Sequence, residues 1–192
     1  MEKELEELEK YLSEFEAAEG GWILHEDECA TRIMFPDFGK LYLGGLRSLE
    51  KLRDEVIKVD TVISLCEIPS DRYVFDLGRV EHFEFLVRDD PTPETVTLMK
   101  KICEQCSDIL DTRLSNKKKV LVHCAAGMSR SATVVLHYFI TKYATPPPNV
   151  TPKDLVFTSL KVVKSDRKST YPNRGFLELL LEAAGKKIGK DT

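Results

Sequence analysis

Long apolar runs are absent from this sequence of 192 residues, and none reaches the roughly 20 residues that a transmembrane helix needs. The first residues, MEKE, also lack the apolar core of a secretory signal peptide. We therefore expect neither a membrane protein nor a secreted one, and we expect a cytoplasmic location with access to the nucleus. With 42% hydrophobic and 31% charged residues, the composition is that of a globular domain.

An excess of basic residues is absent as well. The chain has 28 Lys and Arg against 32 Asp and Glu, a net charge of −4, whereas a nucleic-acid-binding protein usually carries a basic excess. We therefore expect no nucleic-acid partner. The charge is unevenly distributed, because residues 1–20 hold eight Glu and two Lys and carry −6, which leaves +2 for the rest.

That acidic segment has the pattern of an amphipathic helix. Leu5, Leu8, Leu12 and Phe15 recur at spacings of three and four residues, and two glycines follow at 20 and 21. We expect a helix that packs on the body of the protein, with a partner or dimer contact as the alternative. This predicts two regions, an acidic helix over 1–20 and a catalytic domain over 21–192.

Five cysteines, an odd number, make a disulfide framework improbable. Cys103 and Cys106 form a single CxxC pair without a second pair or a histidine cluster at zinc spacing, so we expect no metal site. They share a helical spacing with Met99 and are expected in the core. Cys66 ends an apolar run and is expected in a buried strand.

Strand-like and helix-like patterns alternate along the chain. We expect strands near 33–35, 41–43, 59–66, 82–87 and 120–123, and helices near 92–113, 129–143, 151–164 and 173–187. We detect no internal repeat and no linker. The pattern predicts a single layered α/β domain, with a central, mostly parallel sheet of four to five strands flanked by helices and an extra N-terminal helix.

One segment carries a pattern that predicts chemistry. His123, Cys124, Gly127, Arg130 and Ser131 stand in the arrangement HCxxGxxRS where an apolar strand passes into an apolar helix. Such a junction directs backbone N–H groups and the positive end of a helix at one point, which favours a thiolate and binds an anion. The arginine adds a bidentate fork for phosphate. The residues expected to bind a phosphoryl group are Ala125, Ala126, Gly127, Met128, Ser129 and Arg130.

This segment resembles the signature of cysteine-based protein tyrosine phosphatases. The Asn173-x-Gly175-Phe176 stretch and the Leu41–Gly45 run are similar to the dual-specificity branch, in particular to its small atypical members. The resemblance implies a protein tyrosine phosphatase-like fold and a phosphocysteine intermediate on Cys124. It also implies phosphorylated proteins as substrates, at tyrosine and at serine or threonine, without a cofactor.

The roles of the remaining site residues follow from the same chemistry. Phosphomonoester cleavage needs a proton donor, and Asp89 and Asp90 both lie in a loop between a strand and a helix. The family's pattern favours Asp89, while Asp90 suits the helix start. Ser131 is expected to assist the sulfur as leaving group, and His123 and Asn173 are expected to support the loop.

Other substrates and another class of function stay open. The loop interior has no lysine, which disfavours inositol phospholipids and thus the alternative of a phosphoinositide phosphatase. An RNA 5′-triphosphatase is the other alternative on the same scaffold. A phosphate-binding pseudophosphatase usually loses the Cys or the Arg, and both are present here. A basic run from 161 to 168 is either a solvated helix end or a second phosphate site, for which Arg167 is the best candidate.

Overall fold

The computed structural model describes residues 1–18, 30–34, 39–69 and 80–191. A five-stranded sheet in the order β1-β2-β5-β3-β4 forms its centre. The β1–β2 pair is antiparallel and the three other pairs are parallel, which confirms the predicted, mostly parallel sheet. The strands are β1 (Ala30–Ile33), β2 (Lys40–Gly44), β3 (Thr61–Ser64), β4 (Glu81–Glu84) and β5 (Lys119–His123).

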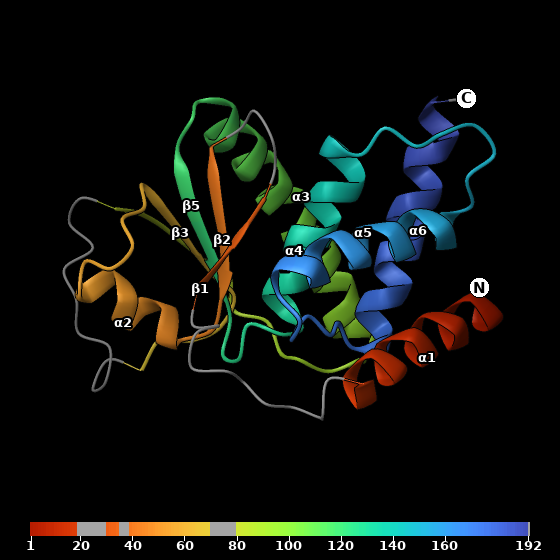
Figure 1. Cartoon of the computed structure of the whole chain (residues 1–192), viewed down its shortest axis with the longest axis horizontal. Helices are drawn as coiled ribbons and strands as arrows, with labels where there is room; N and C mark the ends of the chain where they lie inside the picture. Colours follow the sequence, from red (N-terminus) through yellow and green to blue (C-terminus); the bar gives the residue numbers. More distant parts are fainter. Residues whose placement is uncertain (19–29, 35–38, 70–79, 192) are drawn as a thin grey trace.

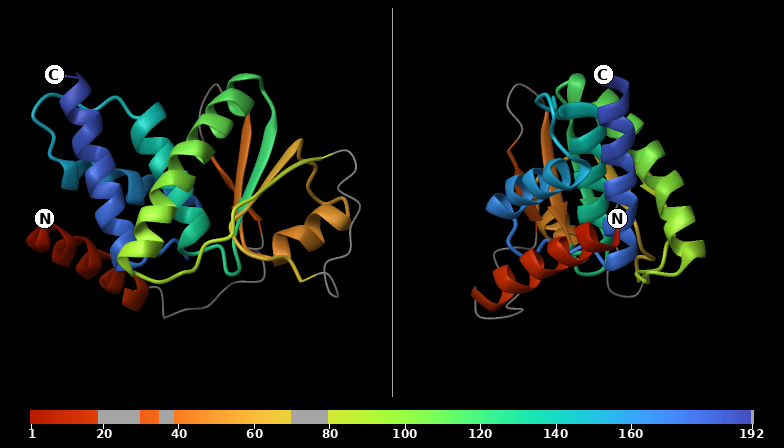
Figure 2. Two further views of the ribbon diagram at one scale, coloured as in Figure 1. Left: turned by 180° about the vertical axis from the view of Figure 1, so that it is seen from behind. Right: turned by 90° about the vertical axis from the view of Figure 1, so that its right-hand side faces the viewer.

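Helices cover both faces of this sheet, as Figures 1 and 2 show. A short helix lies on one face, and a layer of long helices packs on the other. The short one is α2 (Arg47–Arg53), and the layer consists of α3 (Pro93–Ser115), α4 (Arg130–Tyr138), α5 (Pro152–Asp166) and α6 (Arg174–Asp191). The sequence pattern does not predict α2, because seven residues with one fully buried leucine, Leu49, give too short a pattern.

The two helices that begin at a Thr-Pro pair start where the sequence predicts. Thr92 precedes Pro93 at the start of α3, and Thr151 precedes Pro152 at the start of α5. Thr151 also forms a capping box with Asp154, since each side chain bonds to the backbone N–H of the other residue. The helix predicted over 129–143 is divided, because its end, η2 (Phe139–Tyr143), is a π-helix.

The N-terminal helix α1 (Glu2–Ala18) packs on α5 and α6. Leu5, Leu8 and Leu12 are at most 1% exposed and belong to the same core cluster as the helical layer. Tyr11 meets Phe157 of α5 edge-on at 4.5 Å between ring centroids. The apolar face of α1 is thus covered within the chain, and a contact with a partner stays a prediction. Gly20 and Gly21 lie outside the described residues.

The parallel strands place three polar or flexible positions at the carboxyl ends of neighbouring strands. Gly44, Ser64 and His123 are the last residues of β2, β3 and β5, and both Gly44 and Ser64 lie in register with His123. The chain segments that follow β5 and β4 meet below these strand ends in Figure 1. Among the described residues, no helix is long and apolar enough to span a bilayer.

Candidate active site

The segment from Cys124 to Ser129 forms a loop between β5 and α4. The Cys124 side chain is 1% exposed, and its Sγ accepts hydrogen bonds from the Gly127 N–H and the Ser131 hydroxyl, each at 3.2 Å. Gly127 has φ of +75°, and a Cβ there would collide with the backbone of Gly44, so only glycine fits. The sulfur is therefore held by two hydrogen-bond donors.

Five consecutive loop carbonyls point away from the sulfur. Each has a partner atom outside the loop. Cys124 O lies 3.4 Å from His123 Nδ1, and the carbonyls of Ala125 and Met128 accept from the backbone N–H groups of Leu46 at 2.9 Å and Tyr171 at 2.8 Å. Arg167 donates through Nη2 to Ala126 O at 3.3 Å and through Nε to Gly127 O at 2.9 Å. Because the C=O and N–H of a trans peptide point in opposite directions, the amides of residues 125–129 face inward. The loop is thus a ring of N–H donors around one point.

Arg130 closes one side of this ring. Its Nη1 donates to Val87 O at 3.1 Å and to Leu65 O at 3.3 Å, which fixes the guanidinium plane. The Nε is buried, makes no hydrogen bond within the described part of the chain, and lies 3.5 Å from Asp89 Oδ2. A buried donor without an acceptor is costly, and a phosphate oxygen at this point would satisfy it.

The two candidate acids occupy different places. Asp89 Oδ1 accepts hydrogen bonds from Ser129 Oγ at 2.6 Å and from Asn173 Nδ2 at 2.9 Å, so its carboxyl group faces the loop. Asp90 Oδ1 instead accepts from the Thr92 hydroxyl at 2.5 Å and the Thr92 N–H at 3.2 Å, before the start of α3. These bonds lower the pKa of Asp90. Asp90 therefore serves the helix start, and Asp89 is the carboxyl group at the loop.

Arg167 does not lie where a second phosphate could reach it. Its side chain is 1% exposed, and besides the two loop carbonyls it donates through Nη1 to Thr31 Oγ1 at 3.0 Å. The prediction of a secondary substrate site at Arg167 is wrong, because the chain after α5 turns this guanidinium inward behind the loop. Arg167 instead braces the loop from outside.

The remaining predicted residues lie in or beside the loop. Ala125 and Ala126 are exposed and Met128 is half-buried, whereas Ser129 is buried and engaged with Asp89. The backbone N–H of Asn173 donates to Ser129 Oγ at 3.2 Å, and its Oδ1 accepts from the Phe176 N–H at the start of α6. The structure thus brings these residues together around Cys124.

Residues 41–186 match the family profile described as "Dual specificity phosphatase, catalytic domain". This match covers most of the chain, including the loop, Asp89 and Asn173. The chain belongs to the dual specificity phosphatase family.

Two curated relatives show the extent of the similarity. The dual specificity protein phosphatase MPK-4 of Drosophila melanogaster is 26% identical over 144 residues, which is 73% of this chain and 33% of that protein. The dual specificity protein phosphatase 26 of Rattus norvegicus is 42% identical over 65 residues, which is 33% of this chain and 25% of that protein. The matched segments thus span a third or less of these relatives' own lengths.

Solved structures share the fold. The Yvh1 phosphatase domain from Chaetomium thermophilum superimposes with a TM-score of 0.64 at 24% identity, over 85% of this chain and 99% of that one. A structure of DUSP15 has a TM-score of 0.60 at 26% identity, over 81% and 86% of the two chains. Dual specificity phosphatases thus have the layered architecture that the sequence predicts.

Two residues near the loop are not predicted by the sequence pattern. Ser64 Oγ lies 2.7 Å from His123 Nε2 and 2.8 Å from His82 Nε2, on the far side of His123 from the loop. Burial lowers the pKa of His123 to about 4. A serine inside the apolar run Val62-Ile63-Ser64-Leu65 is the one signal that pointed to Ser64, and nothing local pointed to His82.

The other described cysteines are buried and unpaired. Cys103 and Cys106 are fully buried on α3, as predicted for core residues. Burial raises the pKa of the Cys66 thiol to about 11 and that of Cys106 to about 12, so these thiols stay protonated at neutral pH. Cys29 lies outside the described residues.

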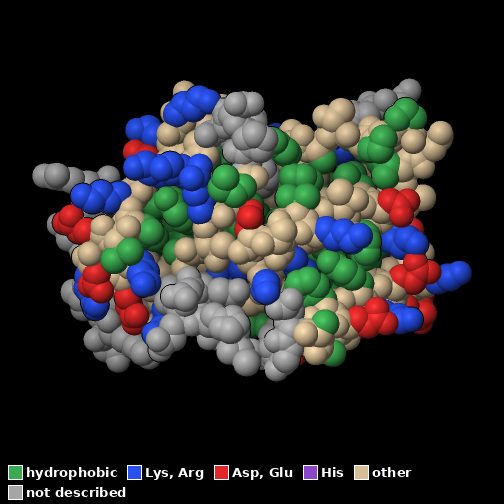
Figure 3. Space-filling view, viewed as in Figure 1, with side chains coloured by type: hydrophobic (Ala, Val, Ile, Leu, Met, Phe, Trp, Pro, Cys, Tyr) green, Lys and Arg blue, Asp and Glu red, His purple; other side chains and the backbone are tan. Residues whose placement is uncertain are grey.

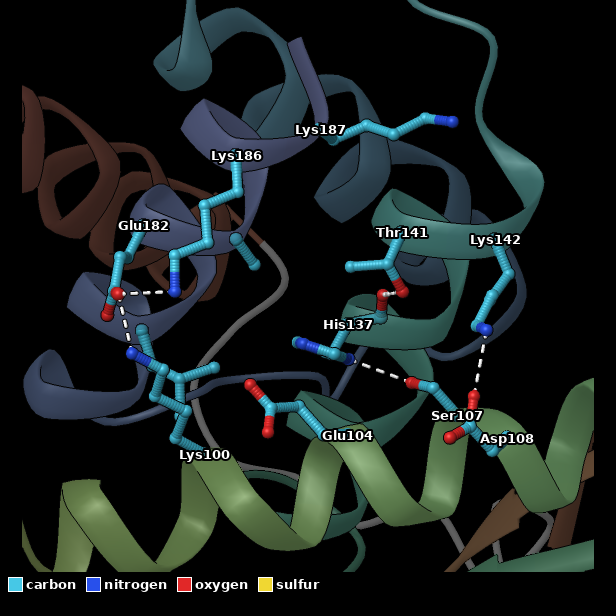
Figure 4. Close-up of a pocket in the computed structure, with 12 residues that line it drawn as sticks. Lys100, Glu104, Ser107, Asp108, His137, Thr141, Lys142, Glu182, Lys186 and Lys187 are labelled. Atoms are coloured by element: carbon cyan, nitrogen blue, oxygen red, sulfur yellow. Dashed lines mark hydrogen bonds and ion pairs between the residues drawn. The ribbon is translucent and has the colours of Figure 1, made fainter. Parts of the chain in front are cut away.

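A cavity of about 320 Å³ lies on the helical side, between α3, α6 and the end of α4 with η2 (Figure 4). Its lining includes the Lys100–Glu182 pair at 2.5 Å, the Lys142–Asp108 pair at 2.8 Å and the buried His137. None of its lining residues belongs to the loop. The cavity is therefore separate from the loop around Cys124.

Proposed function

We propose that this dual specificity phosphatase domain hydrolyses phosphomonoesters of phosphotyrosine and of phosphoserine or phosphothreonine in proteins. The observation that carries the proposal is the ring of inward N–H groups around a buried cysteine sulfur, with the Arg130 guanidinium at its side. Such a ring matches the equatorial oxygens of a phosphoryl group in transfer. The carboxyl group of Asp89 faces the same loop.

In the first step, the Cys124 thiolate attacks phosphorus and forms a sulfur–phosphorus bond as the bond to the ester oxygen breaks. Asp89 gives its proton to that departing oxygen. Arg130 and the loop amides stabilise the charge on the three transferring oxygens. The products of this step are a phosphocysteine and the free tyrosine, serine or threonine side chain.

In the second step, a water molecule attacks the phosphocysteine. The Asp89 carboxylate takes a proton from this water, and the sulfur leaves as a thiolate while phosphate is released. The Ser131 hydroxyl donates to the sulfur at 3.2 Å and thus stabilises the leaving thiolate. Ser129 and Asn173, which bond to Asp89 Oδ1, hold the acid over the loop through both steps.

The choice of protein substrates rests on the loop and on family membership. The loop interior carries no lysine that would meet the additional phosphates of an inositol lipid. We therefore infer that one phosphoryl group on a polypeptide is the group recognised. We also propose the cytoplasm as the place of action, in keeping with the sequence.

Hydrolysis of an aryl phosphate and of phosphotyrosine and phosphothreonine peptides tests the proposal. Cys124→Ser is expected to abolish turnover, and Asp89→Asn to reduce kcat by about 10²- to 10⁴-fold, the usual contribution of a general acid. Asp90→Asn is the matched control and should retain most of the wild-type kcat. Acid quenching of wild type during turnover should trap phosphate on Cys124, seen by mass spectrometry.

Turnover by Cys124→Ser at the wild-type rate would contradict the mechanism. Tight binding of phosphopeptides by wild type without any hydrolysis would show a phosphate-binding protein instead. If Asp90→Asn lost activity while Asp89→Asn kept it, the assignment of the acid would be wrong and the nucleophile would stand.

A further inference from the structure

Three side chains form a hydrogen-bonded row across the sheet, from its edge to the catalytic loop. His82 lies on the edge strand β4 and is exposed, while Ser64 on β3 and His123 on β5 are fully buried. Ser64 Oγ lies 2.8 Å from His82 Nε2 and 2.7 Å from His123 Nε2. His123 Nδ1 then lies 3.4 Å from Cys124 O, the first carbonyl of the loop.

The row admits two directions of donation. The Ser64 hydroxyl has one hydrogen and donates to one imidazole only, so the other imidazole must donate to Ser64. If Ser64 donates to His123, His123 Nε2 is an acceptor and its hydrogen sits on Nδ1. If Ser64 donates to His82, neutral His123 carries its hydrogen on Nε2, and its Nδ1 has none.

The carbonyl of Cys124 decides between the two directions. A carbonyl oxygen only accepts, so it needs a hydrogen on His123 Nδ1, and a bare Nδ1 would set two acceptors against each other. His123 cannot hold a hydrogen on both nitrogens at neutral pH, because burial keeps its pKa near 4. The order is therefore His82 Nε2–H to Ser64, Ser64 O–H to His123 Nε2, and His123 Nδ1–H to Cys124 O.

We propose that Ser64 and His82 are positioning residues of the phosphate-binding loop, which act by fixing the tautomer of His123. The inference rests on the proposed function, since it assigns residues that prepare the same loop for catalysis. The Cys124 carbonyl and the Ala125 N–H belong to one planar peptide. A bond that holds this carbonyl outward therefore aims the first amide of the ring at the substrate.

This carbonyl differs from the other four in how it is held. Backbone amides or the buried Arg167 guanidinium hold the carbonyls of residues 125–128, and none of those donors has a tautomer to choose. Only the Cys124 carbonyl depends on a neutral imidazole, which donates from Nδ1 in one tautomer alone. The loop thus depends on a side chain that lies two strands away at the edge of the sheet.

Tautomers in the full chain provide a test that does not require turnover. The protein is labelled with ¹⁵N-histidine, and long-range ¹H–¹⁵N correlations at pH 7 report which nitrogen of each of the four histidines carries hydrogen. We expect His123 with hydrogen on Nδ1 and His82 with hydrogen on Nε2. A wild-type His123 with hydrogen on Nε2 would overturn the proposal.

Kinetic variants test the consequence. His82→Leu removes the donor at an exposed position, and His82→Gln is the matched control because its amide retains an N–H at a similar reach. We expect His82→Leu to lower kcat for an aryl phosphate about three- to tenfold with little change in KM, because the misaimed amide acts chiefly in the transition state. His82→Gln should recover most of that loss. Ser64→Ala should lower kcat further, by about ten- to a hundredfold.

The outcomes separate this inference from the proposed function. If the wild type is active, and His82→Leu has the same kcat and the same His123 tautomer as the wild type, the inferred role of His82 is rejected and the phosphatase mechanism stands. A wild type that neither hydrolyses phosphate esters nor forms phosphocysteine would reject the proposed function. The tautomer spectrum would still show whether the row of His82, Ser64 and His123 donates in the inferred direction. If Ser64→Ala does not fold, the two exposed His82 variants carry the test.

Discussion

At the scale of single residues, the loop is held by groups that lie behind it and contact its carbonyls. Arg167 holds two loop carbonyls, and His123 holds a third. A chain segment can present its N–H groups inward only if its carbonyls have donors elsewhere, because an unpaired buried carbonyl is costly. Residues behind the loop thus set the geometry of the proposed phosphate-binding site.

A substitution of Arg167 distinguishes this bracing role from a role in substrate binding. Arg167→Lys keeps the charge but loses the fork that reaches Gly127 O and Ala126 O together. We expect kcat for a small aryl phosphate to fall by about tenfold or more, in line with the cost of misplaced oxyanion donors. Steady-state kinetics on substrates with one and with two phosphates measure it, and a defect confined to the doubly phosphorylated peptide would contradict the bracing role.

Two buried histidines make stability depend on pH. Burial lowers the pKa of His123 and of His137 from 6.5 to about 4, so the unfolded chain binds more protons than the folded one between these values. We therefore expect the contribution of these two histidines to stability to be complete above about pH 6.5 and to be lost as the pH drops toward 4, by about 3 kcal/mol for each histidine.

Urea denaturation at pH 7, 5.5 and 4.5 measures this dependence. His137→Gln keeps a hydrogen-bonding group for Ser107 but does not titrate, and it is expected to lose less stability over this range than wild type. His137 lies at the helical cavity and not at the loop, so the substitution leaves the proposed chemistry in place. If the free energy of unfolding depended on pH to the same extent in the two proteins, the lowered pKa of His137 would be contradicted.

At the scale of elements, α1 binds the body through its leucines and not through its glutamates. Leu8 is 1% exposed within the core cluster, whereas the pairs of Glu7 with Lys153 and of Glu9 with Arg174, although short at 2.5 Å, involve side chains that are about a third or more exposed. Exposed ion pairs contribute little, because water screens them and ordering the side chains costs entropy. At the end of the molecule where α1 lies, acidic and basic side chains alternate over the surface (Figure 3).

Two substitutions on α1 separate these contributions. Leu8→Ala is expected to destabilise the protein by about 2–5 kcal/mol through lost burial and a cavity. Glu9→Gln is the control on the same helix and should cost about 1 kcal/mol or less. Chemical denaturation of both variants measures the difference, and a Leu8→Ala protein as stable as wild type would show that α1 is not anchored by its apolar face.

At the scale of the whole molecule, α1 and the helical layer share one hydrophobic core. Contacts of α1 also lie next to the site, since Glu2 and Glu9 pair with Arg174. Arg174 directly follows Asn173, which bonds to Asp89. The division into a helix over 1–20 and a catalytic domain over 21–192 stays a prediction. The shared core favours one cooperative folding unit that includes the helix.

Removal of residues 1–20 tests that unit. The chain 21–192 retains every proposed catalytic residue but exposes the surfaces of α5 and α6 that α1 covers. We expect its Tm to fall by about 5 °C or more, since a loss of 1 kcal/mol already shifts Tm by about 2–4 °C in a domain of this size. Calorimetry measures the shift, and addition of the peptide 1–20 should reverse part of it. An unchanged Tm would show that the helix is an independent appendage.

The sequence by itself determined the order of the elements apart from the short helix α2, the loop around Cys124 and the family. These features depend on residues close together in the chain: the apolar periodicity of each helix or strand, the Thr-Pro helix starts, and nine consecutive residues from His123 to Ser131. Local patterns of this kind can be recognised in the sequence because each element must bury its own apolar face.

Only the tertiary structure decided which groups serve the loop from a distance. Asp89 and Asp90 are neighbours in sequence, and contacts with Ser129, Asn173 and Thr92 alone separate their roles. The direction of Arg167 follows from a turn after α5, and the row from His82 to His123 requires three strands in register. Apart from the local contact of Asp90 with Thr92, these arrangements join residues 18 to 136 positions apart, and no local pattern specifies such pairings before the sheet and helices pack.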